Sequence, residues 1–249
     1  MRLTRVYCPG PLAADAEIAL PEAAATHVAR VLRLRPRDPL IVFDGHGSVY
    51  RAEIATIAGG RVEVRLLDRL AETTESPLEV TLVQAVSRGE RMDWTLQKAT
   101  ELGVSAIAPV LAARSVVRLD ARQGDAKLKH WQAVVVAACE QSGRSVLPAL
   151  RAPEPLRTYL ERPADPGVRL VLDPGAGDEL AALPPPGREV HLLVGPEGGL
   201  DDQELEAARS AGFRPVRLGP RVLRTETAGT VALAVLQSRW GDLGGSGRG

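Results

Sequence analysis

The sequence contains few cysteines, histidines and aromatic residues. Its 249 residues include two cysteines and four histidines, and the aromatic residues make up 3% of the chain. Cys8 and Cys139 are too few to form a disulfide framework and do not have the spacing of metal ligands. None of the histidines follows an HxH or HExxH spacing, so we expect no bound metal.

Long apolar runs and a net charge are also missing. The longest unbroken apolar run covers residues 133–139, far less than the ~20 residues that a membrane helix needs. The first ten residues contain no apolar segment of the kind that secretion requires, so we expect a cytoplasmic protein with no membrane partner. The 31 basic and 31 acidic residues cancel, so only a local basic patch can attract nucleic acid.

The composition that remains is that of an ordinary folded protein, with 45% hydrophobic and 25% charged residues. In its amino-terminal part, strands are expected at residues 40–43, 49–57 and 62–67, separated by an Asp-Gly-His-Gly and a Gly-Gly turn. Apolar and charged residues alternate along the last of these strands, which is typical of a strand with one buried face. A short helix within residues 22–34 is expected to pack on them. We therefore expect a β-rich domain over residues 1–72.

After a polar stretch at residues 71–77, the pattern changes to alternating strands and helices. Strands are expected at residues 80–86, 106–111, 168–172, 190–195 and 215–218, and helices at 91–102, 126–141, 202–211 and 226–240. This alternation indicates a mostly parallel α/β sheet. We expect a second domain over residues 77–243 and a flexible, glycine-rich tail at 244–249. An apolar stripe on the last helix is expected to face the core or a second subunit; it comprises Ala228, Val231, Ala232, Val235 and Leu236.

The loop at residues 195–200, Gly-Pro-Glu-Gly-Gly-Leu, leaves a strand and leads into a helix. Asp201 as N-cap and Glu204 three residues later predict a capping box there. Glycine-rich turns before helices commonly bind phosphate. Here, however, Pro196 lacks an N–H and the carboxylate of Glu197 repels anions. A neutral or cationic ligand fits this loop better, and a tight connection without any ligand is the alternative.

A second loop, at residues 218–228, leads into the last helix. Val222 and Leu223 are apolar residues in a connection, where polar residues are usual, so they line either a pocket or a tight crossover. Arg224 and Glu226 form either a functional pair or a surface ion pair.

Two groups of basic residues provide local positive charge. The first contains Arg30, Arg33, Arg35 and Arg37, close to His27. The second contains Arg114, Arg118, Arg122, Lys127, Lys129 and Arg144. Such groups contact the phosphates of nucleic acid or form a solvated face.

Five stretches together resemble the RsmE family of bacterial ribosomal RNA methyltransferases, within the SPOUT class. They are HVARVLRL (27–34), SRGERMDWTLQKATELGV (87–104), AACEQSGR (137–144), LLVGPEGGL (192–200) and LGPRVLRTETA (218–228). The resemblance implies an α/β protein with an amino-terminal PUA-like β-barrel that binds RNA and a carboxy-terminal SPOUT domain with a trefoil knot. It also implies a homodimer, S-adenosylmethionine as cofactor, and methylation of N3 of one uridine in the decoding region of 16S rRNA, presented as naked RNA or in the small ribosomal subunit.

The resemblance also assigns site residues. The cofactor would contact Leu172, Gly195, Pro196, Glu197, Gly198, Leu218, Gly219, Leu223, Thr225 and Ala228. RNA would contact Arg5, His27, Arg30, Arg33, Arg88, Arg91, Arg114 and Arg144. Arg224 would stabilise the uracil anion, and Glu226 would orient Arg224 or receive the proton. Two rival functions stay open: a non-catalytic RNA-binding protein whose α/β domain only dimerises, and a nucleotide-dependent enzyme that uses residues 195–199 as a phosphate loop.

Overall fold

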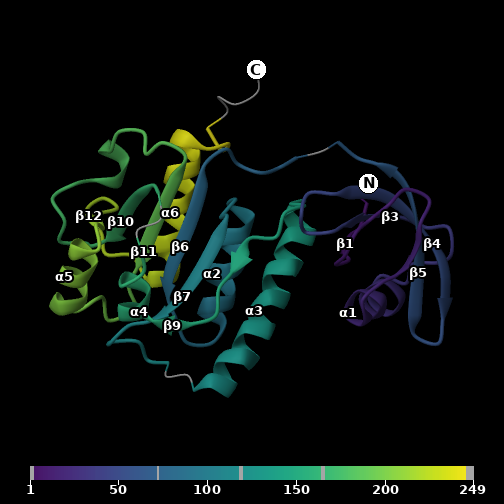
Figure 1. Cartoon of the computed structure of the whole chain (residues 1–249), viewed down its shortest axis with the longest axis horizontal. Helices are drawn as coiled ribbons and strands as arrows, with labels where there is room; N and C mark the ends of the chain where they lie inside the picture. The colour runs from purple at the N-terminus through teal and green to yellow at the C-terminus, as the bar shows by residue number, and fades with distance from the viewer. Residues whose placement is uncertain (1–2, 72, 118–119, 164–165, 245–249) are drawn as a thin grey trace. The chain divides into compact units, whose positions relative to one another are not determined.

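The computed structural model describes residues 3–71, 73–117, 120–163 and 166–244. The chain divides into two compact units, and Figure 1 shows the elements of each. The first contains Met1–Glu75 and Val136–Leu147, and the second contains Ser76–Val135 and Pro148–Gly249. Part of the expected second domain therefore packs with the first unit. Arg118 and the last five residues of the expected tail lie outside the described residues.

The first unit is built on a five-stranded sheet. Its strands are β1 (Arg5–Tyr7), β2 (Glu17–Ala19), β3 (Pro39–Phe43), β4 (Val49–Ala58) and β5 (Arg61–Arg69), in the order β1-β3-β4-β5-β2. The pairs are antiparallel except β1 with β3. Val62, Val64 and Leu66 are completely buried, as the alternation in β5 predicts. The sequence pattern missed β1 and β2, because three residues are too few to show a period.

The predicted short helix is an α-helical segment, α1 (Glu22–Thr26), followed by the π-helical turn η1 (His27–Val31). Ala25 and Val28 point into the core of the first unit. The carboxyl-terminal end of α3 (Ala121–Ser142) also belongs to this unit, and Cys139 packs there against Phe43 and Val49.

The second unit contains a sheet of seven strands that is entirely parallel. This agrees with the mostly parallel sheet predicted from the sequence. The strands are β6 (Glu79–Ala85), β7 (Ala106–Leu111), β8 (Ala149–Leu150), β9 (Glu154–Pro155), β10 (Val168–Leu172), β11 (Glu189–Val194) and β12 (Arg214–Val216). The order is β12-β10-β11-β6-β7-β8, with β9 also paired to β7. Its central strands are nearly continuous apolar runs, because both faces of a parallel sheet are covered.

Helices cover the two faces of this sheet (Figure 1). α2 (Glu90–Glu101) packs on α6 (Thr225–Trp240), which also contacts β6 and β11. α4 (Leu156–Leu160) and α5 (Asp202–Ser210) pack on each other, and the core between them and the sheet contains Val83, Leu193 and Phe213. The short 3-10 helix η2 (Leu180–Ala182) contacts α6. The sequence pattern missed α4 and η2, which are too short to show a helical period.

Of the predicted stripe on α6, Ala232 and Leu236 are completely buried within the chain. Val231 is 37% exposed, whereas the polar Gln237 is completely buried. The amide oxygen of Gln237 accepts a hydrogen bond from the Ser76 hydroxyl at 2.6 Å, and its nitrogen donates to the carbonyl of Gly103 at 3.3 Å. These bonds offset the cost of burying the amide, which periodicity alone cannot indicate.

Candidate functional site

A pocket of about 330 Å³ opens at the carboxyl ends of β10, β11 and β12, where ligands of parallel sheets usually bind. Both loops singled out in the sequence line it. It is large enough for a small molecule of nucleoside size. From the predicted cofactor residues it contains Leu172, Gly195, Pro196, Glu197, Leu218, Gly219, Leu223, Thr225 and Ala228, and from the predicted catalytic pair both Arg224 and Glu226.

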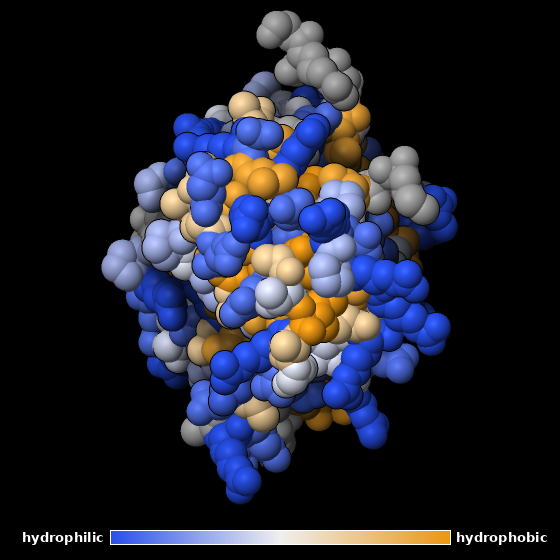
Figure 2. Space-filling model, turned by 90° about the vertical axis from the view of Figure 1, so that its right-hand side faces the viewer, coloured by the Kyte–Doolittle hydropathy of each residue, from blue (hydrophilic) through white to orange (hydrophobic). Residues whose placement is uncertain are grey.

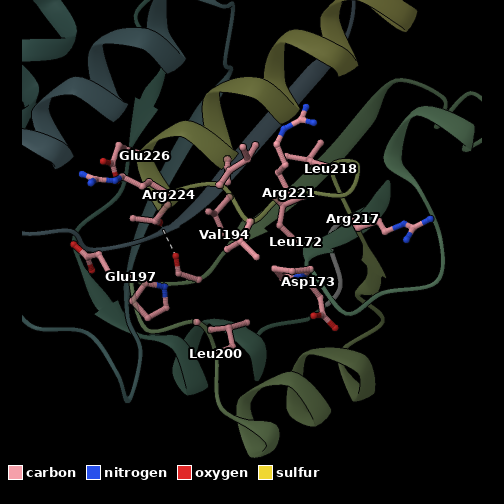
Figure 3. A pocket seen from close by; sticks show the side chains of 18 of the residues that line it. Leu172, Asp173, Val194, Glu197, Leu200, Arg217, Leu218, Arg221, Arg224 and Glu226 are labelled. Carbon is pink, nitrogen blue, oxygen red and sulfur yellow. Dashed lines mark hydrogen bonds between the residues drawn. The ribbon is translucent and has the colours of Figure 1, made fainter.

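Apolar and charged residues line different parts of the pocket (Figure 3). Leu172, Val194, Leu200 and Leu218 form apolar walls. Glu197, Arg224 and Glu226 gather at one edge, as Figure 3 shows. The pocket therefore offers apolar surface for a flat ring next to a charged edge.

Contacts from outside the pocket fix the glycine-rich loop. The predicted capping box of α5 is present: the Asp201 side chain accepts from the Glu204 N–H at 2.8 Å, and the Glu204 carboxylate accepts from the Asp201 N–H at 3.1 Å. The other oxygen of Glu204 accepts from the N–H of Ala113 at 2.7 Å. Arg114 donates to the carbonyl of Gly198 at 3.0 Å. Arg114, predicted to contact RNA, thus supports this loop.

Gly195 and Gly198 differ in their surroundings. A Cβ on Gly195 would lie 3.1 Å from Leu200 Cγ and 3.2 Å from the Leu200 nitrogen, so a side chain there would press against Leu200, which also lines the pocket. Gly198 is not among the lining residues, and a Cβ on it would meet the side chain of Arg114 at 3.3 Å. Gly198 therefore lies outside the lining of this pocket, and its contact with the cofactor stays a prediction.

A buried hydrogen-bond chain joins the two loops. The hydroxyl of Thr225, at the start of α6, donates to the carbonyl of Gly195 at 2.6 Å. The amide nitrogen of Gln84 donates to the same hydroxyl at 3.0 Å and to the carbonyl of Ala85 at 3.1 Å. Gln84 is completely buried on β6. The chain fixes the position of the glycine-rich loop relative to the first turn of α6, where Arg224 and Glu226 lie.

Arg91 of α2 lies between the two carboxylates of the charged edge. Its Nη1 is 3.3 Å from Glu197 Oε1, and its Nε is 4.0 Å from Glu226 Oε1. The other oxygen of Glu226 is buried and has no hydrogen-bond partner among the described residues. The expected pairing of Arg224 with Glu226 is not present in the described part of the chain, where Glu226 is instead within 4.0 Å of Arg91. Arg224 is exposed at the N-cap of α6.

Two of the arginines predicted to contact RNA lie inside the first unit. Arg5 is 8% exposed and Arg144 is 4% exposed. Arg144 Nε donates to the Glu75 carboxylate at 3.1 Å, and Arg5 donates to the carbonyl of Arg144 and lies 5.2 Å from the centre of the Phe43 ring. These contacts hold the first unit together, so the expectation that both arginines bind phosphate is corrected.

The other residues predicted to contact RNA are on the surface. His27, Arg30, Arg33 and Arg88 are exposed. Neither cysteine offers a reactive group, because both are buried and burial raises the pKa of the Cys139 thiol to about 12.

The described residues include no cluster of His, Cys, Asp or Glu that could hold a metal ion. Within the same part of the chain, no helix has both the length and the apolar character needed to cross a membrane.

Sequence reasoning missed several residues of the site. Asp173 and Pro174 line the pocket directly after β10. Because ligands of parallel sheets bind at the carboxyl ends of the strands, their position after a predicted strand could have indicated them. Arg217 and Arg221 also line it, but Figure 3 shows their guanidinium groups pointing away from its centre, and Arg217 pairs with Glu179 at 2.8 Å. A polar residue within an apolar strand is the signal that would have indicated Gln84.

Comparisons with known proteins match both units. Residues 74–237 match the RNA methyltransferase domain family, and residues 20–67 match the RNA methyltransferase PUA domain family. The ribosomal RNA small subunit methyltransferase E of Buchnera aphidicola is 33% identical over 242 residues, which cover 97% of this chain and 98% of that protein.

Solved structures are similar over almost the whole chain. The ribosomal RNA small subunit methyltransferase E of Neisseria gonorrhoeae, bound to S-adenosylmethionine, has a TM-score of 0.93 and 39% identity, covering 97% of this chain and all (100%) of that one. A Legionella pneumophila protein described as a methyltransferase, in complex with the same cofactor, has a TM-score of 0.94 and 38% identity, with coverage of 97% and 100%.

Proposed function

The chain belongs to the family of ribosomal RNA small subunit methyltransferases E, and we propose that it methylates N3 of one uridine in the decoding region of 16S rRNA. Its cofactor is S-adenosylmethionine. The observation that carries this proposal is the pocket at the ends of β10, β11 and β12, with apolar walls beside the carboxylates of Glu197 and Glu226. A sulfonium nucleoside is cationic at one end and flat and apolar at the other, so it matches this pocket better than a polyphosphate.

Each part of the pocket has a role in holding this cofactor. Leu172, Leu218 and Leu223 pack against the adenine ring, and the backbone at Gly195 and Gly219 approaches the nucleoside closely. Pro196, Thr225 and Ala228 complete the lining. Glu197 is positioned to favour a positive charge near the loop. The bound cofactor supplies a methyl group on a positively charged sulfur, which is open to displacement along the line of the breaking bond.

The charged edge of the pocket is suited to the proton chemistry of the uracil. N3 of uracil attacks as an anion, so a group must take its proton. The buried, unpartnered oxygen of Glu226 is the acceptor. Arg91, 4.0 Å from the other oxygen, orients this carboxylate. Arg224 is exposed at the mouth of the pocket and stabilises the negative charge on the uracil oxygens.

The first unit is the RNA-binding part in this proposal. Its surface residues His27, Arg30 and Arg33, together with Arg88 of the second unit, contact phosphates of the RNA. We further propose the family architecture for this chain: a closed PUA-like barrel over residues 1–72, a knotted domain over 77–243, and a homodimer. The substrate, in the cytoplasm, is 16S rRNA or the small ribosomal subunit.

Methyl transfer to small-subunit RNA tests the proposal. The protein is incubated with S-adenosylmethionine and small subunits isolated from a strain that lacks the corresponding gene, and the RNA is digested and analysed by mass spectrometry. We expect N3-methyluridine at one position in the decoding region. Methylation at another base atom would overturn the N3 assignment. Binding of the RNA without methylation would favour the non-catalytic alternative, and tighter binding of ATP than of S-adenosylmethionine would favour a phosphate loop.

A further inference from the structure

The segment between α1 and β3 exposes two apolar side chains on the first unit. Val31 is 64% exposed and Leu32 is 38% exposed, whereas Val28 is completely buried. The π-helical turn produces this arrangement, because the N–H of Leu32 donates to the carbonyl of His27, five residues back, at 2.9 Å. Turns of this kind occur often at functional sites.

The backbone after this turn adopts a conformation that few residues other than glycine adopt. Arg33 has a φ of 55° and Arg37 a φ of 74°. Between them Leu34 returns to the core of the unit, and its N–H donates to the carbonyl of Val28 at 3.1 Å. The segment is therefore held in a defined shape with Val31 and Leu32 on the outside, and non-glycine residues in this region of φ are concentrated at binding sites.

The basic side chains of the same segment are available to an external anion. Arg30, Arg33, Arg35 and Arg37 are exposed, and none has an ion pair within the described residues. The nearby Asp38 uses its carboxylate to accept the backbone N–H of Arg35 at 2.7 Å. Elsewhere on this unit, by contrast, Arg65 is paired with Glu17 at 2.8 Å.

We propose that Val31 and Leu32 pack against an unpaired nucleobase of the RNA while the adjacent arginines hold its phosphates. This inference rests on the proposed function and adds a base-contacting element to it. Arginines alone would serve a duplex, whose phosphates are exposed and whose bases are stacked inside. Apolar side chains between them are suited to a base that has left the stack, as in loops and single strands.

Exposed apolar surface bordered by charge is a general sign of a binding site. Figure 2 shows hydrophobic side chains reaching the surface between strongly hydrophilic ones on the face it presents. The four arginines make RNA, rather than a second copy of this chain, the partner that complements the charge around Val31 and Leu32.

The test compares two RNAs and two variants of the full-length protein. The RNAs are a hairpin with a loop of unpaired bases and a fully paired duplex of equal length. The variants are Val31→Ser/Leu32→Ser and, as a control, Val116→Ser, a valine that is 63% exposed in the second unit. Affinity is measured as a function of salt concentration, and S-adenosylmethionine binding is measured on the same samples.

We expect the Val31→Ser/Leu32→Ser variant to bind the hairpin about tenfold more weakly, the reduction expected when apolar surface is no longer covered. Its affinity for the duplex, its salt dependence and its cofactor binding should not change, and Val116→Ser should behave like wild type. Equally weakened binding of both RNAs, unchanged binding of both, or a change in oligomeric state would overturn the inference. If the wild-type protein binds neither RNA, this inference fails, whereas intact methyl transfer to the small subunit would leave the proposed function standing.

Discussion

The arginines around the pocket of the second unit differ from those between α1 and β3 of the first unit in how they are paired. Around the pocket of the second unit, Arg91 and Arg217 are paired with carboxylates and Arg114 with a backbone carbonyl, so the protein itself supplies their partners. On the first unit, Arg30 and Arg33 are exposed, and neither has an ion pair within the described residues. Paired arginines are held in position by the protein and so preorganise a site before the ligand binds. Unpaired arginines are available to bind an external anion. Arg224 is an exception in the second unit, because it lies at the pocket without an ion pair among the described residues.

The largest effect is expected for this exception. Removal of one preorganised donor to a developing negative charge typically lowers a rate about 100- to 1000-fold, and we expect a decrease in that range for Arg224→Ala. Arg224→Lys should recover part of it, because the charge is kept and only the planar fork is removed. The measurement is single-turnover methylation with cofactor and RNA both saturating. Full activity of the Ala variant would make Arg224 a binding residue at most.

A smaller effect is expected from the hydrogen-bond chain behind the pocket. Thr225→Val keeps the shape of the side chain but leaves the carbonyl of Gly195 without the hydroxyl that donates to it, and removes one of the two acceptors of the Gln84 amide. We expect about tenfold weaker S-adenosylmethionine binding, since an unsatisfied buried polar group typically costs about 1–3 kcal/mol. Thr225→Ser retains the hydroxyl and should restore the affinity. The affinity of each variant for S-adenosylmethionine is measured by calorimetric titration. If Thr225→Val binds the cofactor as tightly as wild type, these hydrogen bonds do not position the loop.

Replacing the unpaired arginines of the first unit should weaken RNA binding without changing the binding of the cofactor. Removing one phosphate-binding side chain lowers the salt dependence of RNA binding by about one unit of slope, so Arg30→Ala/Arg33→Ala should lower it by about two and weaken RNA binding. Arg65→Ala is the matched control, because Arg65 already has Glu17 as its partner. If both variants show the salt slope of the wild type, Arg30 and Arg33 only form a solvated face.

The smallest effect concerns Glu140, at the end of α3 in the first unit. Burial raises the pKa of its carboxyl, although the Tyr7 N–H, which it accepts at 2.9 Å, acts in the opposite direction. A raised folded-state pKa means that stability is lost as the pH rises through that value. Glu140→Gln removes this pH-dependent loss of stability, and the amide oxygen of the glutamine can still accept the hydrogen bond from the Tyr7 N–H. Its melting temperature should exceed that of wild type by about 2 °C at pH 7, with no difference at pH 4. A lower melting temperature at pH 7 would show that the charged carboxylate is stabilising.

Local patterns predicted much of both units. The alternation in β5 and the capping box formed by Asp201 and Glu204 depend on residues close in the sequence, and both are present. The parallel type of the second sheet was predicted from the local alternation of strand and helix patterns, and it is present too. Contacts between distant residues were not predictable. Arg5 and Arg144 look like surface arginines until the fold brings them together with Glu75.

The same limit applies within the site. The two loops were found from their composition, yet the partner of Glu226 proved to be Arg91, which comes from α2 far away in the sequence. Similarly, nothing in the Gly-Pro-Glu-Gly-Gly sequence distinguishes Gly195, which lines the pocket, from Gly198, which faces Arg114. That difference depends on how the loop is folded.

The two glycines provide the most direct test that the pocket at the ends of β10, β11 and β12 is the cofactor site. S-adenosylmethionine is titrated calorimetrically into wild type, Gly195→Ala and Gly198→Ala, with circular dichroism to verify that each is folded. We predict that Gly195→Ala weakens binding about tenfold or more, because its Cβ displaces Leu200 in the pocket wall. Gly198→Ala should bind like wild type, since only the flexible side chain of Arg114 must move. Unchanged affinity in a folded Gly195→Ala variant would contradict this placement of the cofactor.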